Sequence, residues 1–152
     1  MATANGRFHG WRITRVDLDF ARPERSEVEV EVDVASLDTG SARRDDHLRS
    51  DDFFDVAKWP TATVKIHQAS RSGESERGHP RYAARFSVRI RVVEQTVTGE
   101  FEVTSESPLT VEGHLVLNRV DFGVGDPHRR WNPLSIRDEI PVEFTARIPG
   151  GS

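Results

Sequence analysis

The chain of 152 residues has no cysteine, which excludes disulfides, thiol catalysis and every cysteine-ligated metal site. Basic residues are also few: the chain has 21 of them and 25 acidic residues. The resulting net charge of −4 argues against a nucleic-acid partner. No apolar run approaches the roughly 18 residues of a membrane-spanning helix. Met1–Gly6 lacks the charged and apolar regions of a secretory signal. We therefore expect a cytoplasmic protein that does not span a membrane, or a periplasmic or secreted one if its N-terminus has been trimmed.

Hydrophobic residues are sparse as well, at 36% of the chain. A length of 152 residues suits one domain, because two would leave each core marginal. A lean composition spread along the whole chain is typical of strands with one solvated face. We therefore treat residues 1–152 as a single domain, with a polar tail at 149–152.

The dominant pattern in the chain is strict alternation of apolar and polar residues. Residues 27–34 place four valines on one face and four acids on the other, as a half-buried strand requires. Six further segments alternate in the same way: 16–20, 62–66, 82–92, 97–103, 109–117 and 140–148. Short turns separate most of them, including one at 125–127. Seven sequential amphipathic strands predict an all-β antiparallel barrel or sandwich.

Three segments depart from simple alternation. Trp11 and Ile13 are out of phase with Val16, which predicts a β-bulge near Thr14. Residues 69–79 are rich in serine, glycine and charge, and we expect a mobile hairpin loop there. Residues 36–60 are charged without alternation and predict one or two short helices capping one end of the barrel.

The helical segment has candidate caps and two adjacent aromatic residues. Ser41 or Asp45 is placed to cap a first helix, and Ser50 or Asp51 a second turn that ends before Pro60. Phe53 and Phe54 lie in the second turn. In so polar a segment their rings need an apolar partner, so we expect them to cover an open end of the barrel.

Three sequence motifs resemble the YceI-like family. The first runs from Asp33 to Pro60 and includes DVASLDTG at 33–40, RDDHLRS at 44–50, DFFD at 52–55 and Trp59-Pro60. The second is LNRVDFGVG at 117–125, and the third is GRFHGW at 6–11. The three motifs come in the family's order, and the match as a whole covers about residues 6–149. The resemblance implies a lipocalin-like antiparallel barrel of eight strands, with a hydrophobic tunnel in which some members hold polyisoprenoid chains such as isoprenoid quinones.

The chain departs from the family pattern in two places. Family members usually have a further strand about twenty residues before the position of Phe8. A start upstream of Met1, a trimmed chain and an open seven-stranded barrel are the alternatives. An open barrel exposes two strand edges and favours pairing with another chain, such as a homodimer. In the second place, residues 89–97 replace the family's glycine-rich turn, which leaves the shape of that hairpin open.

The first functional hypothesis is a non-enzymatic carrier of a long apolar lipid, an isoprenoid or isoprenoid quinone, without any other cofactor. The inward row of side chains would line the tunnel: Val28, Val30, Val64, Phe86, Val88, Phe101, Leu115 and Phe144. Phe53 and Phe54 would cover one end, while Arg119 and Asp121 would contact a head group or form a structural tether at the rim. The small inward residues Ala62, Ala84, Gly99, Gly113 and Ala146 favour open space over a filled core.

Two other classes of function stay open. A cofactor-free barrel enzyme could use Asp46 with His47, or Arg119 with Asp121, if their side chains converge on a pocket. An interaction module could complete its barrel with a strand from another chain. We assign no catalytic residue, since neighbours on a short helix do not all face one pocket and no nucleophile motif accompanies them.

Histidines and surface charges favour a structural role. None of the six histidines is paired at the spacing of a helical metal site, so we predict no metal. His67 and His114 fall on outward faces. The outward arginines Arg85, Arg89 and Arg91 would pair with the acids of residues 27–31 if the two strands are neighbours.

Overall fold

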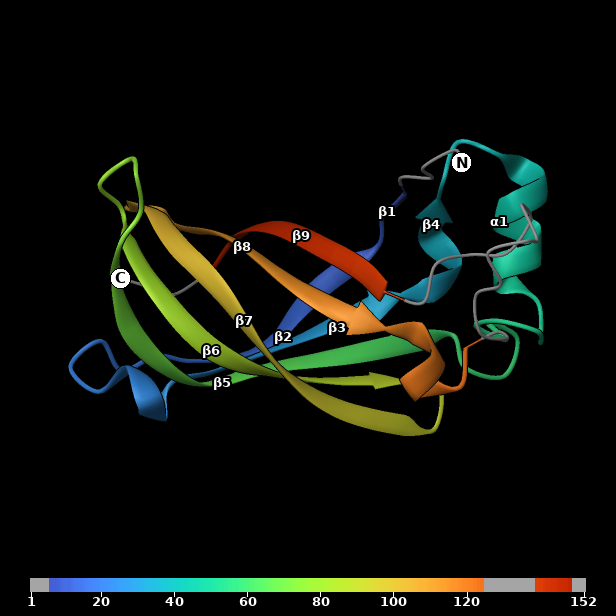
Figure 1. Cartoon of the computed structure of the whole chain (residues 1–152), viewed down its shortest axis with the longest axis horizontal. Coiled ribbons are helices and arrows are strands. Elements are labelled where there is room, and N and C mark those ends of the chain that lie inside the picture. The colour runs from blue at the N-terminus through green and yellow to red at the C-terminus, as the bar shows by residue number, and fades with distance from the viewer. Residues whose placement is uncertain (1–5, 125–138, 149–152) are drawn as a thin grey trace.

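The computed structural model describes residues 6–124 and 139–148, which form one curled antiparallel sheet with a single α-helix at one end (Figure 1). The sheet has seven strands in the order β2-β3-β5-β6-β7-β8-β9. A separate pair joins the two-residue strands β1 and β4. The strand bounds are β1 Arg7–Phe8, β2 Trp11–Asp17, β3 Glu27–Asp33, β4 Leu37–Asp38, β5 Thr61–Glu74, β6 Pro80–Ile90, β7 Val93–Glu106, β8 Leu109–Asn118 and β9 Glu139–Arg147.

The seven predicted strands and their inward faces are confirmed. Residues that pair across strands lie on one face, so Val28 of β3, opposite Val16 and Ile66, shares the inner face with them. The predicted bulge is confirmed too, because the β2–β3 register shifts between Ile13 and Arg15. The first strand begins and ends earlier than its alternation suggested, which leaves Leu18 and Phe20 in the β2–β3 loop.

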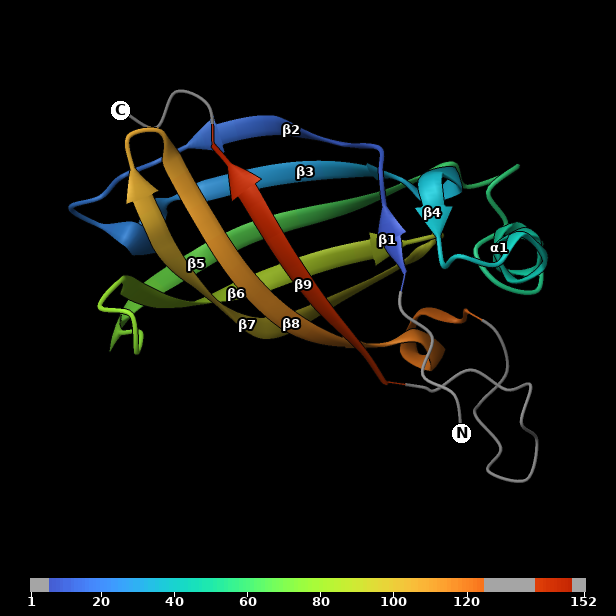
Figure 2. The ribbon, with the colours of Figure 1, turned by 90° about the horizontal axis from the view of Figure 1, so that it is seen from above.

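The curled sheet does not close into a barrel within the described residues. β2 and β9 are its edge strands. Every neighbouring pair is antiparallel, and six such steps separate β2 from β9, so the two edges run in the same direction (Figure 2). Direct antiparallel pairing between them is therefore impossible. Within the described residues the sheet is thus an open arrangement of seven strands.

One end of the sheet is covered by the segment that breaks the strand pattern. The 3-10 helix η2 (Val34–Ser36) leads through β4 to α1, Ala42–Arg49, whose N-cap Ser41 accepts a hydrogen bond from the Arg44 backbone amide at 3.3 Å. Of the one or two short helices predicted, α1 is present, and the predicted second turn is formed without a further helix. Phe53 and Asp55 donate backbone hydrogen bonds to Ser50 O in it. A further 3-10 helix, η3 (Arg119–Phe122), follows β8 beside this covering segment.

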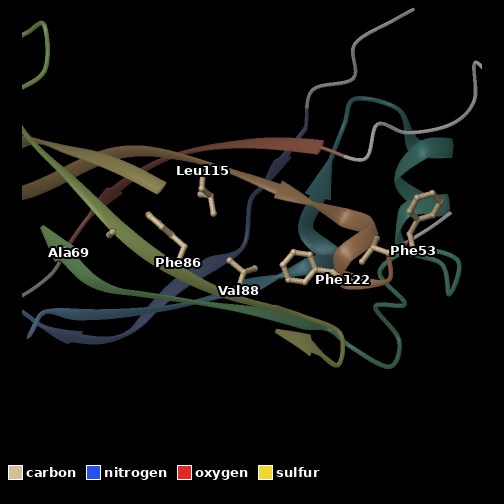
Figure 3. Close-up of a cluster of buried hydrophobic side chains, with 8 residues drawn as sticks. Phe53, Ala69, Phe86, Val88, Leu115 and Phe122 are labelled. Carbon is tan, nitrogen blue, oxygen red and sulfur yellow. The ribbon is translucent and has the colours of Figure 1, made fainter. Parts of the chain in front are cut away.

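The hydrophobic core fills the centre of the curl and the end nearest α1 (Figure 3). Phe122 and Val124, contributed by η3 and the residue after its cap, are almost completely buried. Phe86 and Val88 of β6 and Leu115 of β8 continue the core along the sheet. The order along the axis is Phe53, Phe122, Val88, Phe86 and Ala69, which runs from the helix end toward the opposite end (Figure 3).

Two expectations about the β5–β6 and β6–β7 hairpins are wrong. Residues 69–79 are not a long loop, because β5 continues to Glu74, β6 begins at Pro80 and only five residues form the turn. Val92 does not continue the inward row: it lies in the β6–β7 turn and is 66% exposed. The neighbouring Arg91 has a φ of 59°, in the left-handed region, and lies in the turn that reverses the chain.

The expected pairing between the arginines and acids on the outer face is also wrong. β5 separates β3 from β6, so the rows of acids and arginines are not adjacent. Glu31 pairs instead with Arg12 of β2, while Glu27 lies 3.7 Å from Arg15 Nη1 and 3.4 Å from Lys65 Nζ. The predicted turn at 125–127, His128 and the tail at 149–152 lie outside the described residues.

Candidate functional site

An apolar cavity of about 80 Å³ lies at the end of the sheet opposite α1. It is lined from the β2–β3 loop, from η1 (Pro23–Arg25) within that loop, and from the inner faces of β3 and β5–β9. The lining residues are Leu18, Asp19, Phe20, Pro23, Ser26, Val28, Ile66, Ala69, Tyr82, Phe101, Val103, Leu109, Val111, Phe144 and Ile148. Aliphatic and aromatic side chains predominate, so the cavity suits a ligand without charge.

The polar residues of the cavity wall are engaged in forming the loop. The Asp19 backbone amide donates to Ser26 Oγ at 2.8 Å, and the Arg22 amide donates to Asp19 Oδ1 at 3.0 Å. η1 begins at Pro23, and the fixed φ of proline suits the first position of a short helix. These bonds use the hydroxyl of Ser26 and one carboxylate oxygen of Asp19 within the loop itself, which leaves mainly apolar contacts for a ligand.

Two aromatic rings form one wall of the cavity. Tyr82 of β6 and Phe101 of β7 pair across the strands, and their rings stack with centroids 5.3 Å apart and an interplanar angle of 15°. The Arg71 guanidinium lies 5.8 Å from the centroid of Tyr82. This cation–π interaction helps to hold the ring of Tyr82 in place. The pair is a flat, rigid surface against which an extended apolar chain can pack.

Two of the small inward residues, Gly99 and Gly113, do not create the open space that the sequence suggested. A Cβ at Gly99 would lie 2.6 Å from Phe86 Cε1, and one at Gly113 would collide with the ring of Phe144. The two glycines therefore make room for the protein's own rings, not for a ligand. Phe86 and Phe144 contact each other with ring centroids 5.8 Å apart and close the centre of the interior.

The eight predicted lining residues separate into groups. Val28, Phe101 and Phe144 line the cavity. Phe86, Val88 and Leu115 are buried in the packed core, and Val64 packs against it. Val30 is half-buried between Ile13 and Val64 in the strand register. The prediction did not name the other lining residues. Six of them lie on inward rows that the alternation had identified: Ile66, Tyr82, Val103, Leu109, Val111 and Ile148. The alternation of Val16, Leu18 and Phe20 was a signal for part of the loop, whereas Ala69 had no signal because a β-bulge precedes it.

The end of the curled sheet nearest α1 is covered by Phe53 and its neighbours. Phe53 is buried, His47 meets it edge-on at 4.8 Å between ring centroids, and the Arg119 guanidinium lies 5.8 Å from its centroid. Arg119 also donates to Val124 O at 2.7 Å, which ties the end of η3. Phe54 packs edge-on against Phe8 at 6.4 Å between centroids. These side chains cover this end of the curl.

The side chain of Arg91 binds this end of the curl from the β6–β7 turn. Arg91 Nη1 donates to Phe53 O and to Gly123 O, both at 3.1 Å. Asp121 is exposed and lies at this same end, away from the cavity. The structure thus places Arg119 and Asp121 at the opposite end from the apolar cavity, and Arg119 in a backbone tether.

The proposed acid–base pair does not converge on a pocket. The side chain of Asp46 is 81% exposed and lies 3.4 Å from Arg49 Nη1. The side chain of His47 is 60% exposed, with its Nε2 3.8 Å from Asp52 Oδ2. Within residues 6–124 and 139–148, no three histidine, aspartate or glutamate side chains gather as a metal site. Nor does the described part of the chain contain a helix long and apolar enough to cross a membrane.

A charge network fastens the β5–β6 turn to the outer face of the sheet. Glu102 Oε1 accepts from Arg77 Nη2 at 2.6 Å, and Glu102 Oε2 pairs with His79 Nδ1 at 3.0 Å. Arg77 also reaches Glu112 at 2.7 Å. Hydrogen bonds from Ser75, Arg77 and His79 lower the pKa of Glu102 to about 2. The network stabilises the hairpin beside the cavity and lies outside it.

Comparison with known proteins agrees with this architecture. Residues 1–148 match the YceI-like domain. The chain is 43% identical over 146 residues to UPF0312 proteins of Pseudomonas savastanoi pv. phaseolicola and Pseudomonas syringae pv. syringae; the match covers 92% of the chain and 71% of each relative.

Solved structures share the same fold. BcnA of Burkholderia cenocepacia superposes with a TM-score of 0.76 at 27% identity, over 92% of this chain and 84% of that one. A polyisoprenoid-binding domain from Saccharophagus degradans, implicated in plant cell wall breakdown, superposes with a TM-score of 0.61 at 16% identity, over 92% and 82%. With a family match across nearly its whole length, the chain belongs to the YceI-like family.

Proposed function

We propose that this protein binds a long apolar lipid, an isoprenoid or isoprenoid quinone, as a non-enzymatic carrier. The observation that carries the proposal is the apolar cavity at the open end of the curled sheet, with its rigid wall of Tyr82 and Phe101. The likeness to a solved polyisoprenoid-binding domain supports the same class of ligand. The exposed positions of Asp46 and His47 favour binding over catalysis, since they bring no acid–base pair to the cavity.

Affinity for such a ligand would come from apolar burial. Each buried methylene contributes about 0.8 kcal/mol, so a few isoprene units suffice for tight binding before ordering costs are subtracted. The cavity of about 80 Å³ is smaller than the 150 Å³ cavity that accommodates benzene. It therefore takes the end of a chain, and the remainder of a long ligand must lie elsewhere against the protein.

The first experiment is denaturing extraction of the purified protein followed by mass spectrometry of the extract, then titration of the lipid-free protein with geranylgeraniol. Ala69→Leu tests the cavity, because Ala69 is buried in its wall and a larger side chain would fill it. Ala83→Leu is the matched control, since Ala83 pairs with the exposed Ser70 on the outer face.

The proposal expects micromolar or tighter binding that Ala69→Leu weakens at least about tenfold and Ala83→Leu leaves unchanged. About 1.4 kcal/mol of lost burial, less than two methylenes, is enough for that tenfold change. An empty extract together with no binding of geranylgeraniol by the wild-type protein would overturn the proposal. Equal loss in both variants would place the ligand outside the cavity and overturn it as well.

A further inference from the structure

The inner end of the apolar cavity is formed by aromatic rings and not by the backbone. Phe144 lines the cavity and contacts Phe86, with ring centroids 5.8 Å apart. Phe86 is 1% exposed and does not line the cavity, so its ring lies behind that of Phe144, on the core side. The cavity therefore stops at these two rings, Phe144 and Phe86, which we call the aromatic floor.

Cross-strand pairing places the aromatic floor between two rows of inner residues. The first row runs from β6 to β9 and lines the cavity except at its glycine: Tyr82, Phe101, Gly113 and Phe144. The next row lies two residues nearer to α1 on each strand, and none of its members lines the cavity: Ala84, Gly99, Leu115 and Val142. The boundary of the cavity thus falls between two adjacent rows of the same sheet face.

Small residues on both sides of this boundary leave room that only the two rings occupy. A Cβ at Gly99 would lie 2.6 Å from Phe86 Cε1, and one at Gly113 would collide with the ring of Phe144. Gly113 pairs with Phe101 on one side and Phe144 on the other, so the space above it adjoins the cavity wall. The depth of the cavity is therefore set by side chains that lie over glycines, and loss of a ring would deepen it without any movement of the backbone.

The space that could be gained in this way is limited. Beyond the second row the interior is filled by Val88, Phe122 and Phe53, which follow one another toward α1 and are all buried (Figure 3). One row corresponds to two residues, or about 6.6 Å along a strand. Removal of the aromatic floor thus admits about one further isoprene unit.

We propose that Phe144 and Phe86 determine how much of an isoprenoid chain the protein takes into its interior. Phe144 contacts the tip of the chain, and Phe86 is a positioning residue that holds the Phe144 ring over Gly113. The inference rests on the proposed lipid-binding function and adds a selectivity for chain length to it. Affinity rises with each isoprene unit until the tip reaches the aromatic floor, and it levels off beyond that length.

The test measures dissociation constants for four alcohols that differ by one isoprene unit: prenol, geraniol, farnesol and geranylgeraniol. The proteins are lipid-free wild type, Phe144→Ala and Phe86→Leu, of which the last keeps much of the buried volume. Phe54→Ala is the matched control, because Phe54 is also a half-buried phenylalanine but packs against Phe8 at the opposite end of the sheet. Circular dichroism verifies that each variant is folded.

In wild type, each added unit should raise affinity at least about tenfold up to the levelling-off length and less than about threefold beyond it. A buried methylene is worth about fourfold, so even a partly buried isoprene unit provides a tenfold gain. The first unit beyond the wild-type limit should raise affinity at least about tenfold in Phe144→Ala and at least about threefold in Phe86→Leu. Phe54→Ala should keep the wild-type profile.

Other outcomes overturn the inference in distinguishable ways. An unchanged levelling-off length in Phe144→Ala and Phe86→Leu, with binding retained, would overturn it and leave the proposed function standing. A wild-type affinity that rises through all four alcohols without levelling off would do the same. An equal shift in Phe54→Ala would also overturn it, because a general loosening of the fold would then explain the change. No binding of any alcohol by any folded form would remove the proposed function itself.

A photoreactive probe gives a second readout that includes the wild-type protein. Farnesol with a diazirine at its hydrocarbon end should label Phe101, Gly113 or Phe144 in wild type. In Phe144→Ala the labels should move one row deeper, to Ala84 or Leu115. Labels at Val88 or Phe122 in wild type would overturn the inference, because the chain would then pass the aromatic floor.

Discussion

The ring of Phe144 on β9 lies over Gly113, its direct partner on β8, in the space that a Cβ at residue 113 would need. The same ring contacts Phe86 and forms part of the cavity wall. One aromatic side chain therefore fills the gap left by a glycine, closes the centre of the interior and bounds the open end.

Gly113→Ala should destabilise the protein by about 1–3 kcal/mol, because the added methyl group overpacks a filled site. Urea denaturation followed by circular dichroism measures the loss. Phe144→Leu in the same chain should recover part of it, so the two changes should couple in a double-mutant cycle. Val116→Ala, at an exposed position of the same strand, should change stability by less than about 0.5 kcal/mol. Equal stability of Gly113→Ala and wild type would contradict the packing described here.

The Glu102 network should make stability depend on pH. Its carboxyl has a pKa of about 2 in the folded protein against an ordinary value of 4.5, chiefly through the hydrogen bonds from Ser75 and Arg77. A lowered folded pKa contributes stability that is complete above pH 4.5 and is lost as the pH falls from 4.5 toward 2. Wild type should therefore lose more stability than Glu102→Gln over that range.

Urea unfolding midpoints at a series of pH values measure this difference. Glu76→Gln, in the same turn and exposed, serves as the charge-matched control and should follow the wild-type curve. Parallel curves for wild type and Glu102→Gln between pH 4.5 and 2 would show that the network does not contribute.

Two neighbouring acids on α1 should behave differently. Asp45 is buried, and its Oδ1 accepts from the Thr39 amide at 3.0 Å and from Thr39 Oγ1 at 2.6 Å. Asp45→Ala should cost about 1–3 kcal/mol because it leaves a Thr39 donor without its acceptor. Asp46→Ala removes an exposed acid and should stay within about 0.5 kcal/mol. Thermal unfolding compares the two, and similar losses would refute the assignment of Asp45 as the structural member.

Ligand binding should raise thermal stability. A ligand that binds only the folded state at 100 times its Kd adds about 2.7 kcal/mol, which corresponds to about 5–10 °C for a domain of this size. Differential scanning fluorimetry of lipid-free protein with and without geranylgeraniol measures the shift. Ala69→Leu should reduce it, whereas Ala83→Leu should keep it; a shift of the same size in both would argue against the cavity.

The sequence carried most of the fold because period-two alternation is a local property of each strand. The valines of β3 and the cap residue Ser41 identified their elements without any tertiary information. The errors arose where a longer-range effect intervened. Val92 alternates in phase with β6, yet the chain reverses at Arg91 before it. The acids of β3 pair with residues of β2 and β5, because alternation within a strand does not reveal which strands are its neighbours.

The candidate site was less predictable for a physical reason. Inward direction could be inferred for Val28, Phe86 and Phe101 alike, but only packing decided that Phe86 fills the space over Gly99 while Phe101 faces a cavity. By itself, the sequence determined an all-β domain with one apolar face on each strand and a covering segment at one end. The tertiary structure alone decided which part of that face is filled and which is open, because a void depends on how side chains from distant strands meet.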